Sequence, residues 1–314
     1  EARTRVKGHP LSFLHISKPE IDLPQGTDPY SNEVYEKGAE NLQKLIDDKV
    51  LMRDVKACYY VYRLIMGEHQ QTGLVVTASV ADYDTNRIRK HEYTRPDKED
   101  DRVRQIDALN AQTGPVFLTY RNNKIIESIT QKTASTSPIY DLTADDGVKH
   151  TIWLLSDDDD INTLTTTFDA MDCLYIADGH HRSAAASRIA ELRNKDSNGN
   201  ASHDYFLSVI FPDNQMQILD YNRVITDLNG LSEDELISKI QENFLLEKVN
   251  SLYKPEKSKE FSMYLKGHWY KLEIKKELVP LNDPVASLDI SLLQNNLIAP
   301  LLGISDPRRD KRID

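Results

Sequence analysis

Residues 172–190, DCLYIADGHHRSAAASRIA, join a strand-like segment to a helix-like segment across a single glycine. Cys173–Ile176 is a short apolar run typical of a strand, and Ser183–Ile189 is rich in alanine, which favours a helix. Because Gly179 permits a sharp change of backbone direction, the stretch predicts a strand that leads directly into a helix. A helix entered in this way has free N–H groups at its start, where a phosphate or a carboxylate can bind.

The turn from Asp178 to Arg182 concentrates side chains that could carry chemistry. Arg182 can bind an anion through two parallel hydrogen bonds, and His180 and His181 can donate hydrogen bonds or exchange protons near neutral pH. Asp178 can hold Mg²⁺ or accept a proton. The alternative is a helix start that Asp178 caps, with both histidines merely solvated.

A second group of charged side chains lies in residues 87–102, RIRKHEYTRPDKEDDR, in a predicted turn that enters a helix. His91 beside Glu92 suits proton transfer or metal binding, and Arg95 and Lys98 could neutralise phosphate oxygens. If the two groups converge on one pocket, together they supply what phosphoryl transfer needs, namely cations for the phosphates and a carboxylate for Mg²⁺ or for the acceptor's proton. The alternative is an exposed helix start with ion pairs, which is the usual role of a charge run.

Two other sequence patterns could indicate different functions, namely a zinc site and a surface that stacks on bases. His91, His180 and His181 with an acid could bind zinc, but their spacing matches neither HxH nor HExxH. The tyrosines in residues 59–62 could stack on bases, although alternating aromatic residues in a strand more often divide between the core and its rim.

Composition limits the classes of function. A formal net charge of -11 argues against a general nucleic-acid binder, since affinity for DNA comes largely from Lys and Arg. Cys58 and Cys173 make neither a disulfide framework nor a zinc site, which fits a reducing cytosol. No apolar run approaches the roughly 20 residues that span a bilayer, and no signal-peptide pattern is present. We therefore expect a cytoplasmic protein that binds neither nucleic acid nor membrane.

Apolar periodicity predicts a mixture of strands and helices. The predicted strands are Ser12–Ser17, Tyr59–Met66 and Thr72–Val80 as a hairpin, Val116–Tyr120, Pro138–Leu142, His150–Leu155, Tyr205–Phe211, Phe261–Leu265 and Trp269–Ile274. The predicted helices are Asn32–Asp48, Asp97–Gln112, Lys124–Lys132, one that starts at Asp157–Asp160, Ser232–Asn243 and Asp289–Leu302. Residues 195–204 are predicted to be a polar, flexible loop. This order indicates an α+β fold rather than a regular βαβ series, with a boundary near residue 225.

Six segments in order along nearly the whole chain resemble a large prokaryotic family catalogued as domain of unknown function 1015. They are HPLSFLHISKPEIDLP, HEYTRPDKEDDR, AQTGPVFLTY, YIADGHHRSAAA, LDYNRVITDLNG and LDISLLQ. Members of that family usually have further segments before and after the stretch seen here. The resemblance therefore implies that parts of the site can come from outside this sequence.

The DGHHR turn is similar to that of the ParB, sulfiredoxin and free-serine kinase superfamily, in which a Gly-x-x-Arg or Gly-x-His-Arg turn binds nucleotide phosphates. Gly179, His181 and Arg182 match this pattern, so the resemblance implies that they bind phosphates, and Asp178 matches the kinase-like variants. It also implies a ParB/sulfiredoxin-like mixed sheet core with flanking helices over residues 1–225, followed by a smaller α+β part over residues 226–314.

Within that superfamily, sulfiredoxin chemistry requires a cysteine where this chain has His180, and a ParB-like clamp requires a basic DNA-binding helical domain that the sequence lacks. The leading hypothesis is thus a phosphotransferase that uses ATP or ADP with Mg²⁺ and phosphorylates a hydroxyl of a small metabolite, such as the amino acid serine. His180 would be an auxiliary donor, and Arg95, Lys98, His91 and Glu92 would form the facing wall. The alternatives are a module that senses nucleotides or phosphometabolites without turnover and binds a protein partner, and a metal-dependent hydrolase.

Overall fold

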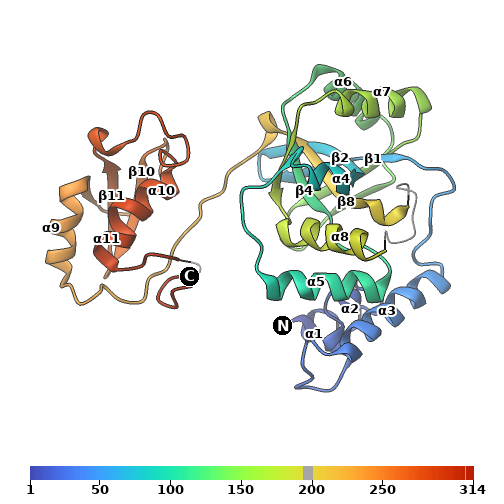
Figure 1. The fold of residues 1–314 in the computed structure, drawn as a ribbon, viewed down its shortest axis with the longest axis horizontal. Coiled ribbons are helices and arrows are strands. Elements are labelled where there is room, and N and C mark those ends of the chain that lie inside the picture. Colours follow the sequence, from blue (N-terminus) through green and yellow to red (C-terminus); the bar gives the residue numbers. More distant parts are fainter. Residues whose placement is uncertain (194–200, 308) are drawn as a thin grey trace. The chain divides into compact units, whose positions relative to one another are not determined.

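The computed structural model of the chain describes residues 1–193, 201–307 and 309–314. Its internal contacts divide it into two compact units, Glu1–Ile218 and Leu219–Asp314 (Figure 1). The sequence analysis places this boundary near residue 225. Of the loop predicted at residues 195–204, residues 195–200 lie outside the described residues, and Ser202–Asp204 form a short 3₁₀ helix.

The first unit is built on a sheet of eight strands in the order β3-β7-β4-β8-β2-β1-β6-β5. The strands are β1 (Tyr59–Met66), β2 (His69–Ser79), β3 (Ile88–Arg89), β4 (Val116–Tyr120), β5 (Tyr140–Thr143), β6 (Lys149–Leu155), β7 (Leu174–Asp178) and β8 (Tyr205–Pro212). The pairs β3–β7 and β4–β8 are parallel and the others are antiparallel. The sheet is therefore mixed, and the predicted α+β class is confirmed.

Helices of the first unit pack on this sheet and on one another. They are α1 (Ala2–Arg5), α2 (Leu14–Ser17), the 3₁₀ helix η1 (Pro19–Asp22), α3 (Asn32–Asp47), α4 (Val80–Asp84), α5 (Pro96–Leu109), α6 (Lys124–Ala134), α7 (Asp158–Asp169), α8 (His180–Arg193) and the 3₁₀ helix η4 (Asp213–Gln215). None of the helices among the described residues is long and apolar enough to cross a membrane.

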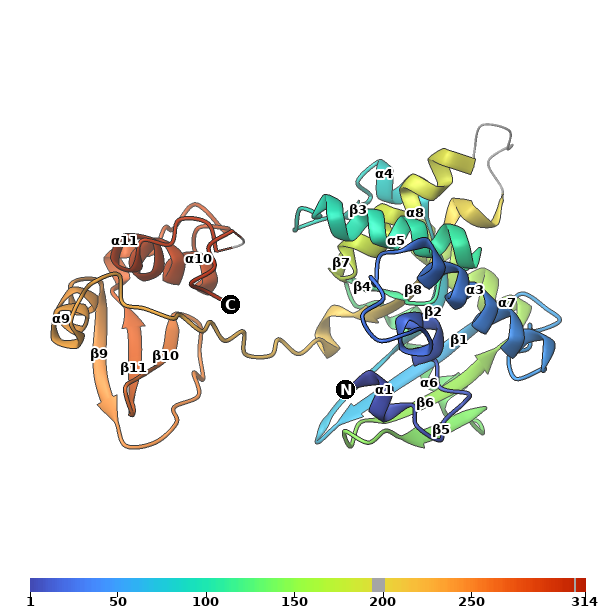
Figure 2. The ribbon, with the colours of Figure 1, turned by 90° about the horizontal axis from the view of Figure 1, so that it is seen from below.

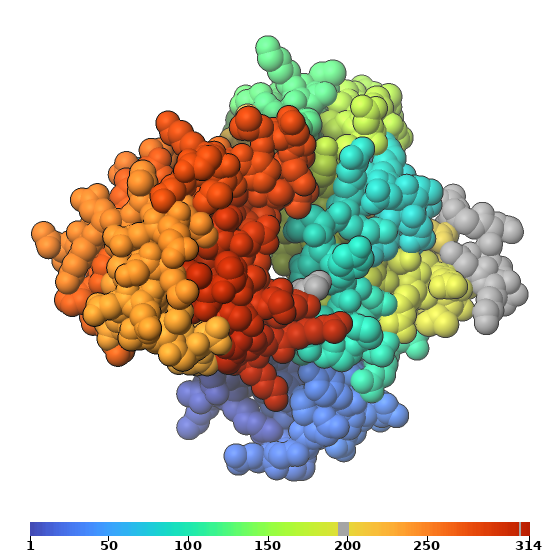
Figure 3. Space-filling model, turned by 60° about the vertical axis from the view of Figure 1, so that its left-hand side comes forward, coloured from blue at the N-terminus to red at the C-terminus, as the bar shows by residue number. Residues whose placement is uncertain are grey.

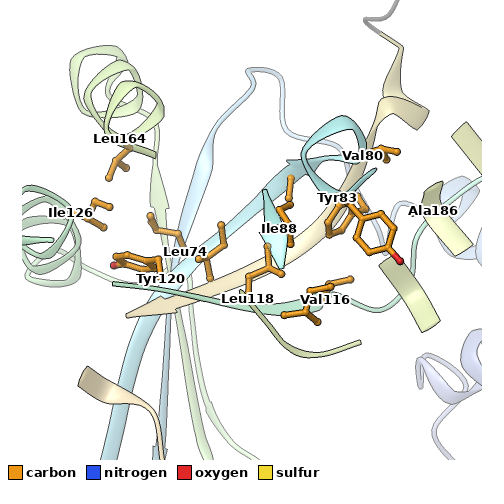
Figure 4. Close-up of a cluster of buried hydrophobic side chains, with 14 of the residues drawn as sticks. Leu74, Val80, Tyr83, Ile88, Val116, Leu118, Tyr120, Ile126, Leu164 and Ala186 are labelled. Atoms are coloured by element: carbon orange, nitrogen blue, oxygen red, sulfur yellow. The ribbon is translucent and has the colours of Figure 1, made fainter. Parts of the chain in front are cut away.

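The main core lies between the sheet and the helices α4, α6, α7 and α8 (Figure 4). Leu118 of β4 is fully buried there, with Ile126 of α6, Leu164 of α7 and Ala186 of α8 in the same cluster. Along β4, the buried residues Val116, Leu118 and Tyr120 alternate with less buried ones, as expected of a strand with one face on this core. Burial of this shared apolar surface fixes where α8 starts relative to β4.

A second layer forms over α8. Helix α5 packs on α8 through Val103, Ile106, Ala185 and Ile189, and α3 lies alongside α5 (Figure 2). The sequence analysis predicted α8 from its run of alanines. These alanines allow the two helices to pack closely, because each side chain is a single methyl group. As a result, the loop that precedes α5 crosses the start of α8.

The tyrosines of β1 divide between the two faces of the sheet. Tyr59 packs against the main core, whereas the ring of Tyr62 on the other face lies 6.5 Å from that of Phe211 in β8. Gly73 of β2 makes room for this contact, because a Cβ atom there would lie 2.7 Å from Cδ1 of Phe211. The tyrosines thus pack on both sides of β1.

The second unit has a sheet and a core of its own. Its strands are β9 (Phe244–Val249), β10 (Glu260–Leu265) and β11 (His268–Ile274), in the antiparallel order β10-β11-β9. Its helices are α9 (Glu233–Asn243), the 3₁₀ helix η5 (Lys276–Leu278), α10 (Asp289–Leu293), a π-helical turn (Gln294–Ile298) and α11 (Ala299–Leu302). Leu236, Ile240, Phe244 and Leu272 are among the buried residues that hold these elements together.

The structure differs from the sequence predictions at several elements, and the short elements α4 and β3 were not predicted. Ser12–Ser17, predicted as a strand, contains the helix α2, because an apolar run this short fits either element. Strand β2 ends at Ser79, whose side chain caps α4 by accepting a hydrogen bond from the N–H of Asp82. Strand β9 was not predicted, since it follows α9 directly without a glycine or proline between them.

Candidate functional site

The turn between β7 and α8 has a backbone that only glycine adopts easily. Gly179 has φ +100°, and a Cβ atom at this position would lie 3.2 Å from Cα of Val116 and 3.1 Å from Nε of Arg182. Strand β7 therefore passes into α8 within one residue while its end remains against the start of β4. The predicted strand–glycine–helix arrangement is present at this point.

Arg182 bridges the ends of these two strands. One terminal nitrogen donates to Oδ2 of Asp178 at 2.5 Å, and the other donates to the carbonyl oxygen of Pro115 at 2.5 Å. The side chain of Asp178 is 72% exposed, against 34% for Arg182. The guanidinium is thus held over the turn, and its partner carboxylate faces solvent.

His180 is buried beneath the loop that precedes α5. Its side chain is 4% exposed, and burial together with the nearby His91 lowers its pKa, while Glu92 and Asp178 act in the opposite direction. Nε2 accepts a long hydrogen bond from the main-chain N–H of His91 at 3.5 Å, and Nδ1 lies 3.6 Å from Oε2 of Glu92. The rings of His91 and His180 meet edge to face, with centroids 4.4 Å apart. The lowered pKa keeps His180 neutral at pH 7.

His181 also contacts the main chain of this loop. Its Nε2 accepts a hydrogen bond from the N–H of Arg95 at 3.0 Å. The Arg95 side chain is 65% exposed and pairs with Asp97 at 2.9 Å. Figure 3 shows the segment around the start of α5, in cyan, beside α8, in yellow-green, on the surface of the first unit. The structure therefore brings His91, Glu92 and Arg95 to the start of α8.

Lys98 points elsewhere. Its ammonium group lies 3.2 Å from the hydroxyl of Tyr30 and 5.8 Å from the centre of that ring, in the segment before α3. Of the second charged cluster, the part before Pro96 meets the turn, whereas Lys98 on the first turn of α5 contacts the N-terminal segment.

One further group at the turn was not among the predicted site residues. The carbonyl of Pro115 accepts a hydrogen bond from Arg182. Pro115 belongs to the AQTGPVFLTY segment, and its place at this site depends on the pairing of β4 with β7. Lys90, directly before His91, instead places its ammonium 3.7 Å from the centre of the Tyr83 ring in α4.

The described residues contain no group of three or more His, Cys, Asp or Glu side chains that could hold a metal ion, so the zinc alternative finds no support among them. Mg²⁺ needs fewer protein ligands than zinc, because it often binds through one or two carboxylates together with phosphate and water oxygens. The exposed carboxylate of Asp178 fits that requirement. Cys58 and Cys173 are both free thiols.

Two cavities of the first unit are lined by residues away from the turn. A cavity of about 400 Å³ is lined by residues of α6 and α7, and another of about 210 Å³ by residues of α3 and α5. Asp178 and Arg182 line neither of these cavities.

Comparison with known proteins places the chain in a family. A family model described as "Protein of unknown function (DUF1015)" matches residues 1–291. No curated protein and no solved structure matches the chain. The matched residues cover the first unit completely and most of the second. The family resemblance read from the six sequence segments is confirmed, and the chain belongs to the DUF1015 family.

Proposed function

We propose that the chain is a nucleotide-binding phosphotransferase whose Asp178–Arg182 turn holds the phosphates. The acceptor would be a hydroxyl of a small metabolite, such as an amino acid. The observation that carries the proposal is the meeting of one guanidinium, one helix start and one exposed carboxylate at a turn without a side chain at its centre. Free N–H groups and the dipole of a helix of 14 residues favour an anion here.

The pairing of Arg182 with Asp178 supports an exchange of partners on binding. A phosphate offers the guanidinium the same pair of oxygen acceptors as a carboxylate, with more charge. When a phosphate takes this place, Asp178 is released to accept a proton from the hydroxyl or to hold Mg²⁺. Bound Mg²⁺ would neutralise charge on the phosphate oxygens. The likeness of the turn to the ParB, sulfiredoxin and free-serine kinase superfamily supports the same ligand class.

Calorimetry with ADP and ATP in the presence of Mg²⁺ tests the proposal. We expect Arg182→Ala to weaken binding by about 10- to 150-fold, because a hydrogen bond to a charged group contributes about 1.5–3 kcal/mol. Arg193→Ala is the matched control, since Arg193 lies at the other end of α8 and pairs with Asp107 at 2.8 Å. Equal affinity of Arg182→Ala and the unmodified protein, or no binding by the unmodified protein, would refute the proposal.

A second candidate is a sensor that binds the same ligands without turnover. It is favoured by the way His180 and His181 accept main-chain hydrogen bonds from the loop before α5, which couples the loop to the turn. The two candidates separate when the protein is incubated with ATP or ADP, Mg²⁺ and a metabolite mixture. A phosphorylated product detected by ³¹P NMR identifies the enzyme, and binding without a product identifies the sensor.

A further inference from the structure

Arg95 presents its main-chain N–H to His181 for a local reason. It is the residue before the helix α5, with φ -90° and ψ 127°, and Pro96 follows it at the first helical position. A residue before proline is restricted to this extended region, so the sequence Arg95-Pro96 fixes the direction of the N–H. The carbonyl oxygen of Arg95 accepts hydrogen bonds from the N–H groups of Lys98 and Glu99 in the first turn of α5.

This contact determines which nitrogen of His181 carries the proton. A ring nitrogen that accepts a hydrogen bond must be unprotonated, and in a neutral imidazole the proton then lies on the other nitrogen. Since Nε2 accepts from Arg95 at 3.0 Å, the proton lies on Nδ1. Within the part of the chain that the structure describes, Nδ1 of His181 has no hydrogen-bond partner, and the side chain is half-buried.

We propose that the main-chain N–H of Arg95 is a positioning group that makes His181 a neutral Nδ1–H donor to a phosphate oxygen at the start of α8. The inference rests on the proposed function and assigns one of its contacts to a single atom. It gives the loop before α5 a role that depends on its backbone, whereas the sequence analysis assigned a role to the Arg95 side chain.

The tautomer can be measured without any ligand. In full-length protein labelled with ¹⁵N-histidine, we expect the two-dimensional ¹H–¹⁵N spectrum of His181 to show an unprotonated Nε2 and a protonated Nδ1. Arg95→Ala keeps the main-chain N–H and should leave this pattern unchanged. Arg95→Pro removes the N–H and should abolish it. A proton on Nε2 in the unmodified protein, or the same pattern in Arg95→Pro, would show that Arg95 does not set the tautomer.

Two substitutions of His181 separate its two nitrogens. The amide of His181→Asn can place a donor near the position of Nδ1, and the amide oxygen of His181→Gln can place an acceptor near that of Nε2. Hydrogen exchange of the Arg95 amide should stay slow in His181→Gln and become faster in His181→Asn. Affinity for ADP with Mg²⁺ should fall about tenfold or more in His181→Gln and remain within a few-fold in His181→Asn.

The outcomes distinguish this inference from the proposed function. If the unmodified protein binds ADP but His181→Gln binds it equally well, the donor role of Nδ1 is wrong and the nucleotide site stands. If the unmodified protein does not bind ADP, the proposed function and the donor role both fail. The tautomer spectrum still decides the contribution of Arg95 in that case.

Discussion

Replacing Gly179 by alanine tests whether the turn at the start of α8 depends on glycine. The φ of +100° places an alanine in a region that costs about 1–3 kcal/mol. The added Cβ atom would also lie 3.2 Å from Cα of Val116, a backbone atom in a buried strand that cannot rotate away. Crowding of this kind adds about 1–3 kcal/mol. We therefore expect Gly179→Ala to destabilise the first unit by about 2–6 kcal/mol.

Urea unfolding and calorimetry measure this change. For a unit of this size, each kcal/mol lowers Tm by about 2–4 °C, so the Tm of the first unit should fall by roughly 4–24 °C. The second unit, with a core of its own, should keep its transition. Because the two units can unfold separately, each transition should be analysed by itself.

Gly114→Ala is a matched control in the same region. A Cβ atom at Gly114 would meet only the Arg182 side chain, at 3.4 Å, which is an ordinary contact. We expect its free energy of unfolding to stay within about 1 kcal/mol of that of the unmodified protein. If Gly179→Ala were as stable as Gly114→Ala, the reasoning from φ and from the Val116 contact would be refuted.

Three further predictions concern stability. Leu118→Ala should cost the first unit about 2–5 kcal/mol, because Leu118 is completely buried, and an unchanged urea midpoint would contradict the assigned core. Ser232→Ala should cost the second unit about 1 kcal/mol, because Ser232 and Glu235 form a capping box at the start of α9; no shift in its thermal transition would contradict this. Lys271 beside Glu260 lowers the pKa of that carboxyl from 4.5 to about 2. The ionised Glu260 therefore stabilises the folded second unit at neutral pH, and this stabilisation is lost as the pH falls from about 4.5 to about 2. The Tm of the second unit should therefore change less with pH in Glu260→Gln than in the unmodified protein. An equal change of Tm with pH in the two proteins would contradict this role of Glu260.

Most helices and strands could be predicted from local pattern. Helix α3, for example, places Val34, Leu42 and Leu45 on one buried face, and its predicted span agrees with the observed one to within a residue. The failures occur where local pattern is ambiguous or absent. Strand β3 has only two residues, Ile88 and Arg89, and its pairing with β7 is made by a segment distant in the sequence.

The candidate site shows a similar division. The residues of the turn were identified because they adjoin one another in the sequence, and the geometry of Gly179 follows from its place between strand and helix. The partners of that turn were harder to identify. Lys98 is three residues from Arg95, yet it contacts Tyr30, because Arg95 meets the turn through its main-chain N–H, whereas the side chain of Lys98 extends from α5 to the segment before α3.

By itself, the sequence determined the α+β class, the strand–glycine–helix turn and membership of the family, because these depend on local periodicity and on short motifs. Only the tertiary structure decided that the N–H of Arg95 meets His181, 86 positions away, and that the carbonyl of Pro115 holds Arg182. The physical reason is that the local sequence can set the direction of a donor such as the Arg95 N–H, but it cannot by itself make either contact. Both depend on the buried surfaces that pack α5 on α8 and pair β4 with β7, and only the folded chain brings those surfaces together.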